Sequence, residues 1–301
     1  MSFAGFPLRR SARIVPPPPG ESDFAGDLAC WSLVERKLLS SARKAGVECL
    51  LRLEPADGTR PHWRPGDLVE LGDISRADAA FEAMARLLPG PRHGAVSLLP
   101  GGWPVGDGCF RRNGARIRLP IASAAASETL DLLIFAGSPS GPALDSDLCG
   151  RLLSGTTIDL RIVGSYLHRA PRGPLLFVGD RTAAALARAI LQEDERHPRL
   201  VLIERGRGDP SLLSEAIFPN RWWRDGTVRM APRLVDAAIL ARALEAQRGQ
   251  VGTAMGEGGH ILVAGSSDDF LAVAWRGLGA FFGDGELVSL GAAGRLATIR
   301  L

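Results

Sequence analysis

The chain has 301 residues, of which 46% are hydrophobic and 23% are charged, with a formal net charge of +3. This length predicts two domains with sizeable cores. The small, scattered positive excess argues against nucleic-acid binding, and no stretch of about 18 residues is apolar enough to span a bilayer.

The cysteines and the N-terminal segment bear on the compartment. Cys30, Cys49, Cys109 and Cys149 form no CxxC pair, and no histidine lies at metal-ligand spacing. This pattern predicts reduced thiols, with no disulfide framework and no metal site. Residues 1–26 contain a polyproline run without the apolar segment of a signal peptide, which predicts a Pro-rich arm. We therefore expect a cytoplasmic protein.

The part of the chain that follows the arm is rich in short strand patterns. Strands are expected at 47–53, 67–71, 115–123, 129–137 and 156–164. Helical spacing is expected at 75–90, with Ser75 as N-cap, and within 145–155. Short strands separated by turns, with a helical insert, predict an antiparallel β-barrel over residues 27–172.

The pattern changes at a joint rich in Pro, Gly and Arg, residues 168–174. Beyond it, apolar strands alternate with amphipathic helices, which is typical of a parallel, doubly wound sheet. The strands are expected at 174–179, 199–205 and 260–265, and the helices at 181–195, 209–218, 235–248 and 266–283. The last stretch, 284–301, is expected to add an edge strand or an ordered tail. The predicted fold class is α/β plus β: the barrel, then a parallel α/β domain over 173–301.

One stretch of the second domain, "PLLFVGDRTAAALARAIL" (Pro174–Leu191), has the strand–turn–helix layout of a nucleotide-binding turn. Such turns carry two or three glycines, because the backbone must approach the phosphates without side chains in the way. Here Gly179 is followed by Asp180 and Arg181. This departure leaves open whether the turn binds a nucleotide.

A barrel followed by an α/β domain, in this order and of these sizes, resembles the ferredoxin–NADP reductases. The segments "WSLVERKLLS", "ECLLRLEPADG" and "WRPGDLVELG" resemble the start of the reductase module in the flavoprotein subunit of NADPH-dependent sulfite reductase and its single-module relatives. "RLPIASAAASETLDLLI" resembles the family's Arg-x-Tyr-(Ser/Pro)-Ile-Ala-Ser strand, and "HILVAGSSDDFLAVAWRGLGAFF" its closing Tyr-Val-Cys-Gly strand and final helix. The resemblance covers about residues 30–285. It implies an FAD-binding barrel and an NAD(P)-binding α/β domain.

On the flavin side, the resemblance implies that the family's Arg binds the FAD pyrophosphate and that its Tyr packs on the flavin ring. Matching "PIAS" puts Leu119 at the Tyr position and Ile117 at the Arg position, between Arg116 and Arg118. The family's Gly-x-x-Ser run is matched at 141–155, where Ser146 lies between two aspartates. The resemblance implies these flavin contacts: Arg116, Arg118, Leu119, Ile121, Ser123 and Ser146. A solvated strand arginine and an ordinary N-cap remain alternatives for Arg118 and Ser146.

On the nucleotide side, the resemblance implies NADH or NADPH as substrate. "VGDRTAA" keeps Gly179 and Thr182, and it also resembles the Gly-Asp-Glu-Thr-Ala turn of siderophore-interacting ferric reductases. The Ser-Arg pair that grips the 2′-phosphate is matched by Ala231-Pro232 and the following Tyr by Ile239, which favours NADH. The nucleotide contacts are then Gly179, Thr182 and Gly265. Ser266 is the catalytic candidate, with a helix cap as its alternative role.

Two functions compete. The leading one is an FAD-binding, NAD(P)H-dependent oxidoreductase that passes electrons from nicotinamide through flavin to an acceptor protein or small molecule. The other is a degenerate, inactive reductase-like module that serves as a binding or assembly subunit. It is motivated by departures at the Tyr, the Arg register, the Gly-rich turn, the Ser-Arg pair and the Cys, which is matched by Ala264.

Overall fold

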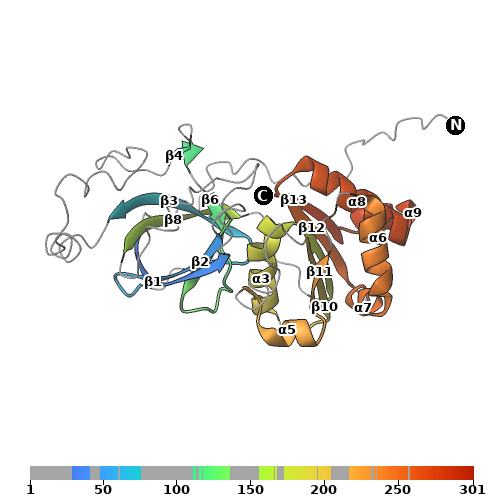
Figure 1. Ribbon diagram of the computed structural model, residues 1–301, viewed down its shortest axis with the longest axis horizontal. Coiled ribbons are helices and arrows are strands. Elements are labelled where there is room, and N and C mark those ends of the chain that lie inside the picture. Colours follow the sequence, from blue (N-terminus) through green and yellow to red (C-terminus); the bar gives the residue numbers. More distant parts are fainter. Residues whose placement is uncertain are drawn as a thin grey trace.

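Two sheets form two adjoining domains (Figure 1). The computed structural model describes residues 29–40, 48–59, 62–75, 111–112, 115–116, 118–135, 156–165, 167, 173–194, 196–204, 217–231, 234, 236–256 and 258–301. The helices expected at 75–90 and within 145–155, and most of the one at 209–218, lie outside these residues, except that Ser75, the expected N-cap, is the last residue of a strand.

The first domain is a nearly closed antiparallel barrel, which confirms the predicted architecture. Its six strands run in the order β6-β3-β8-β1-β2-β7. A bridge between Ile121, directly after β6, and Leu132 of β7 joins the two edges of the sheet. The strands are β1 (Ala29–Ser40), β2 (Glu48–Pro55), β3 (Asp67–Ser75), β6 (Arg118–Pro120), β7 (Leu130–Phe135) and β8 (Thr157–Ser165), and a separate ribbon pairs β4 (Arg111–Arg112) with β5 (Ala115–Arg116).

The barrel closes around an apolar interior because alternate residues of each strand point inward. Leu33, Leu53 and Leu160 lie in this interior with almost no exposed surface. Two indoles meet there edge to face, Trp31 and Trp63, with ring centroids 6.4 Å apart. The interior is thus filled by side chains, so a ligand of this domain would have to lie on its outside.

The second domain is a five-stranded parallel sheet in the order β11-β10-β9-β12-β13, again as predicted. The chain order reverses between β9 and β12, which makes their carboxyl ends the topological switch point of the sheet. The strands are β9 (Leu175–Gly179), β10 (Arg199–Glu204), β11 (Val228–Ala231), β12 (His260–Gly265) and β13 (Leu296–Arg300).

Helices cover both faces of this sheet (Figure 1). A 3₁₀ turn, η1, leads directly into α3, and Ser267 caps α8 by accepting a hydrogen bond from the Phe270 N–H at 3.1 Å. The final stretch, expected as an edge strand or a tail, forms α9 and then the edge strand β13. The helical elements are η1 (Arg181–Ala183), α3 (Ala184–Glu193), α5 (Asn220–Arg224), α6 (Ala237–Ala246), α7 (Arg248–Ala254), α8 (Asp268–Phe282) and α9 (Asp284–Ala292).

Helix α3 joins the two domains, and in Figure 1 it lies between the barrel and the parallel sheet. Arg188 of α3 is buried and contacts the barrel. Its Nη2 lies 2.7 Å from Asp131 Oδ2, and its Nη1 donates to the Ala122 carbonyl at 2.8 Å. One apolar cluster also includes barrel residues, among them Leu50 and Leu133, together with α3 and the sheet. The described residues therefore hold the domains together by both apolar packing and buried charge.

Candidate functional site at the sheet switch point

The candidate site lies where the turns after β9 and β12 meet. The two strands are neighbours, with Gly179 opposite Ala264 in register. The turn after β9 carries Thr182, and β12 ends at Gly265, where Ser266 begins the next turn. Four residues singled out from the sequence, far apart along the chain, thus lie together in space. Their roles toward a ligand stay predictions.

Asp180 occupies the centre of this site. Its Oδ1 accepts hydrogen bonds from the Thr182 N–H at 2.9 Å, the Thr182 hydroxyl at 2.5 Å and the Ala183 N–H at 3.2 Å. Its Oδ2 accepts from the N–H of Ser266 at 2.6 Å and from its hydroxyl at 2.8 Å. The carboxylate caps the helix that begins here and ties the two turns together.

Ser266 therefore takes part in the Asp180 contact. Ser266 does not cap the last long helix, the alternative role that the sequence suggested for it. The N-cap of α8 is Ser267, whose side chain accepts a hydrogen bond from the α8 backbone. Ser266 is 8% exposed. A catalytic role for its hydroxyl stays a prediction, and that role would compete with the hydrogen bond to Asp180.

The glycines of the site leave room for its close packing. A Cβ on Gly265 would lie 2.4 Å from Cδ1 of Phe270 and 3.2 Å from Oδ2 of Asp180. A Cβ on Gly179 would lie 2.6 Å from Cε1 of Phe177 and 2.8 Å from the Ala183 Cβ. The contacts with Phe270, Phe177 and Ala183 are all shorter than 3.0 Å, closer than carbon atoms tolerate, so each glycine is required by the packing within the domain itself.

Replacing Gly265 by alanine should destabilise the protein by about 2 kcal/mol, because overpacking a buried position forces its neighbours to move. Urea-induced unfolding measures the change in the free energy of unfolding. Gly285→Ala on α9 is the matched control, since a Cβ there meets no atom within 4 Å. Adding Phe270→Leu to Gly265→Ala should restore part of the loss. Equal midpoints for Gly265→Ala and Gly285→Ala would contradict the packing argument.

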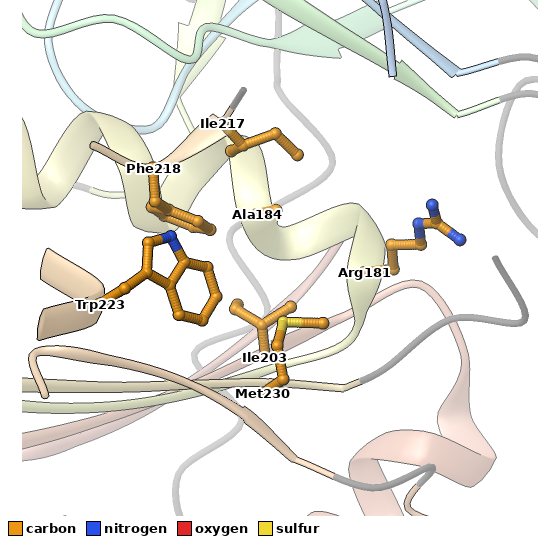
Figure 2. Close-up of a pocket in the computed structure, with 7 residues that line it drawn as sticks. All are labelled: Arg181, Ala184, Ile203, Ile217, Phe218, Trp223 and Met230. Atoms are coloured by element: carbon orange, nitrogen blue, oxygen red, sulfur yellow. The ribbon is translucent and has the colours of Figure 1, made fainter. Parts of the chain in front are cut away.

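A small apolar pocket lies beside the turn after β9, and Figure 2 shows the residues that line it. Phe218 and Trp223 meet edge to face there, with ring centroids 5.9 Å apart. The guanidinium of Arg181 points away from these rings (Figure 2). Burial lowers the pKa of Arg181 to about 10, so this side chain stays protonated at neutral pH. The remaining wall is formed by Ala184, Ile203, Ile217 and Met230.

A second, open groove runs between β11 and α6. It contains Ala231 and Ile239, the positions matched to the 2′-phosphate grip, while Pro232 lies outside the described residues. Arg229 and Arg242 line the same groove. Arg242 was not foreseen, because a helical arginine without tertiary context looks like any solvated surface charge. The groove is thus lined by two arginines, Arg229 and Arg242, and by apolar side chains. This composition suits a ligand with an anionic group and an apolar part.

Most of the residues predicted to contact a flavin lie in or next to the barrel strands. Leu119 and Ile121 are buried in the barrel interior. Positions 118 and 120 belong to the opposite, outer face of the same strand. The register places Arg118 opposite Glu70, a buried carboxylate 2.6 Å from Nη2 of Arg161. The predicted contacts of Leu119 and Ile121 with a flavin ring stay predictions, and the inward packing gives them no support.

The other flavin candidates are also accounted for. Ser123 is buried, and its hydroxyl accepts from the Asp131 N–H at 3.1 Å, while its carbonyl accepts from Trp63 Nε1 at 3.2 Å. Arg116 lies in β5, opposite Arg111, and Ser146 lies outside the described residues. Arg116 and Arg118 therefore remain candidates for a flavin diphosphate by residue type, and this role stays a prediction.

The two implied cofactors fit the described residues differently. Arginine is a residue type suited to a flavin diphosphate, and the sequence offers it at Arg116 and Arg118, whose roles stay predictions. The turn after β9 does not fit a nucleotide diphosphate in this conformation, because Asp180 already engages the Thr182, Ala183 and Ser266 N–H groups. Within the described residues, no three His, Cys, Asp or Glu side chains gather as metal ligands would.

Comparison with known proteins gives a fold likeness and no sequence family: neither a family model nor a curated protein matches the sequence. Ferredoxin-NADP+ reductase from Plasmodium falciparum is 8% identical, with a TM-score of 0.56 over 93% of this chain and 100% of that one. The flavohem-like FAD/NAD binding domain of nitric oxide dioxygenase from Vibrio cholerae is 12% identical, with a TM-score of 0.56 over 92% and 99%. A cytochrome P450 reductase from Amycolatopsis is 17% identical, with a TM-score of 0.52 over 91% and 70%. The chain therefore has the two-domain fold that these ferredoxin reductase-like modules share.

Proposed function

We propose that the protein is an FAD-binding, NAD(P)H-dependent oxidoreductase of the ferredoxin reductase kind. When bound, FAD would supply the means to accept a hydride from the nicotinamide and release electrons singly or in pairs. The acceptor would be a protein or a small molecule. A particular closeness to the flavoprotein subunit of sulfite reductase belongs to this proposal, as do the domain boundaries at 26/27 and 172/173.

One observation carries the proposal: the barrel and the α/β domain have the reductase order and are packed together through α3. A crevice at a switch point of a parallel sheet is where dinucleotides bind in such domains. Gly179, Thr182, Gly265 and Ser266 line up at this point. A neighbour from Neisseria gonorrhoeae, 14% identical with a TM-score of 0.52, carries bound FAD and NADP in this fold.

A second candidate is a reductase-like module that binds or assembles without catalysis. The Asp180 carboxylate favours it, because the donors that a nucleotide diphosphate would use are engaged within the chain. The inward packing of Leu119 favours it too, because this side chain is the match for the family's flavin-stacking tyrosine. The cytoplasmic location expected from the cysteines is common to both candidates. No helix among the described residues has the length and apolar character needed to cross a bilayer.

The spectrum of the purified protein tests the proposal. We expect absorbance of oxidised flavin, either as purified or after incubation with FAD, and bleaching of that absorbance by NADH or NADPH under argon. With Ala231-Pro232 in place of the Ser-Arg pair and Ile239 in place of the Tyr that grip a 2′-phosphate, KM for NADH should be lower than KM for NADPH.

The paired control is Arg118→Ala beside Arg224→Ala on the exposed end of α5. The first should weaken flavin retention at least tenfold, because a cation at the diphosphate is lost, and the second should leave it unchanged. Folded protein that takes up no added FAD would overturn the proposal in favour of the second candidate.

A further inference from the structure

The hydrogen-bond donors at the switch point all converge on one side chain of the chain itself. Three backbone N–H groups, of Thr182, Ala183 and Ser266, and two hydroxyls point at the Asp180 carboxylate. An ionised carboxylate offers about four acceptor sites, so five donors saturate it. Asp180 is 7% exposed, which shields these bonds from water.

Both halves of this arrangement come from the fold. The Thr182 and Ala183 donors belong to the start of the η1–α3 helical segment, where unpaired N–H groups and the helix dipole favour an anion. Ser266 comes from a different turn, 86 residues away, after the neighbouring strand. A dinucleotide diphosphate in a doubly wound domain lies against such a first turn, at the switch point.

We infer that the Asp180 carboxylate takes the place of a dinucleotide phosphate at this turn and thereby sets the affinity of the protein for pyridine nucleotides; this rests on the proposed function. A diphosphate reaches the donors only after the carboxylate has left them. If it stayed, two like charges would compete for the same N–H groups. Asp180 thus acts as a built-in competitor, and nucleotide binds more weakly than the fold alone would allow.

Gly265, the last residue of β12, agrees with this assignment. The Cβ position of Gly265 is 3.2 Å from Asp180 Oδ2, so the second turn is shaped around the carboxylate. The backbone N–H of Ser266 donates to Asp180 Oδ2 at 2.6 Å. Of the five contacts, only that of the Thr182 hydroxyl is shorter. The site is therefore complete without a ligand, and a ligand must replace an existing set of bonds.

The experiment measures binding of ADP-ribose, which has the diphosphate but no nicotinamide and undergoes no redox chemistry. Asp180→Ala frees all five donors and should lower Kd for ADP-ribose at least tenfold by calorimetry, with Kd for adenosine unchanged. The matched control is Asp236→Ala. Asp236 is likewise an N-cap aspartate, accepting from the Ala238 N–H at 3.1 Å, but it caps α6. The control removes the same charge and the same kind of cap, and it should leave Kd unchanged.

Each outcome decides the matter. A folded Asp180→Ala variant, checked by circular dichroism, that binds ADP-ribose no better than the unmodified chain would overturn the inference. The inference would also be overturned if Asp236→Ala gained as much affinity for ADP-ribose as Asp180→Ala, or if Asp180→Ala gained as much affinity for adenosine as for ADP-ribose. If Asp180→Ala does not fold, Asp180→Asn is used, because it keeps the side-chain shape without the charge, and a gain of at least threefold is expected. Failure of both variants to fold would make Asp180 a structural clasp only and refute the competitor role.

This readout is independent of flavin. Protein that takes up no FAD yet gains ADP-ribose affinity in Asp180→Ala would refute the proposed function and keep the inference. If bound flavin is reduced by NADH but Asp180→Ala leaves the affinity for ADP-ribose unchanged, the proposed function stands and the inference is refuted.

Discussion

Replacing Arg188 by methionine should lower the free energy of unfolding by about 3 kcal/mol, because it removes the buried one of the two arginines that pair with the buried Asp131 carboxylate. Asp131 is 2% exposed and would keep the partly exposed Arg52, whose Nε donates to Oδ1 at 3.0 Å and whose Nη2 donates to Oδ2 at 3.4 Å. The Ala122 carbonyl would lose its donor as well. Methionine fills most of the space of the aliphatic stem, so the loss reports the buried charge and hydrogen bonds. Urea unfolding followed by tryptophan fluorescence measures it.

The matched control for Arg188 is Arg248→Met on α7. Arg248 also pairs with a carboxylate, Glu245, but both groups are exposed, and solvent screens the pair. Arg248→Met should have the same midpoint of urea unfolding as the unmodified chain. Adding Asp131→Asn to Arg188→Met should recover part of the loss, because a neutral amide leaves no buried charge. Equal midpoints for Arg188→Met and Arg248→Met would contradict the role of Arg188 as the buried link between the domains.

Replacing Phe177 by alanine should cost about 3–5 kcal/mol, the range for truncating a buried aromatic side chain and leaving a cavity. Phe177 has no exposed surface, and it belongs to the apolar cluster that includes both the barrel residue Leu133 and helix α3. Its ring also packs where a Cβ of Gly179 would otherwise lie. The variant should therefore loosen the turn after β9 as well as the core. Thermal unfolding measures the loss of stability.

Val288→Ala serves as the control for this truncation, since Val288 is 72% exposed on α9 and fills no cavity. The change should leave Tm within the error of the measurement. A second background tests the packing argument: Gly179→Ala should be less destabilising in Phe177→Ala than in the unmodified chain, because its nearest clash has been removed. Additive losses in the two backgrounds would contradict the contact.

Most of the sheet architecture could be predicted because buried parallel strands are continuous apolar runs. "LLFV", "LVLI" and "ILVA" are buried on both faces, and each is one strand of the observed sheet. Strand β1 was not predicted as an element. Its pairing with β2 shifts register between Leu33 and Glu35 and again between Leu38 and Ser40, and such irregularities interrupt the alternation that marks a strand. The edge strand β11 is four residues long and too short to give a pattern.

The candidate site could be predicted only in part. Gly179 ends one strand and Thr182 follows it, while Gly265 ends another and Ser266 follows that one. The adjacency of the two strands was implied by the fold class. The role of Asp180 could not be predicted, because its meaning depends on Ser266, a partner 86 residues away. Arg188 was unpredictable for the same reason: within its helix it has no feature that distinguishes a buried arginine from a solvated one.

The sequence by itself determined the fold class and the order of its parts, because apolar periodicity and turn residues act over short distances along the chain. It also determined which residues stand at the ends of β9 and β12. Only the tertiary structure decided how those residues are used, since hydrogen-bond donors and charges take their partners from whatever the fold brings near. Asp180, a departure from the usual residues of a nucleotide turn in the sequence, is the anion that holds the turn, and Leu119, matched to the flavin-stacking position, packs in the barrel interior.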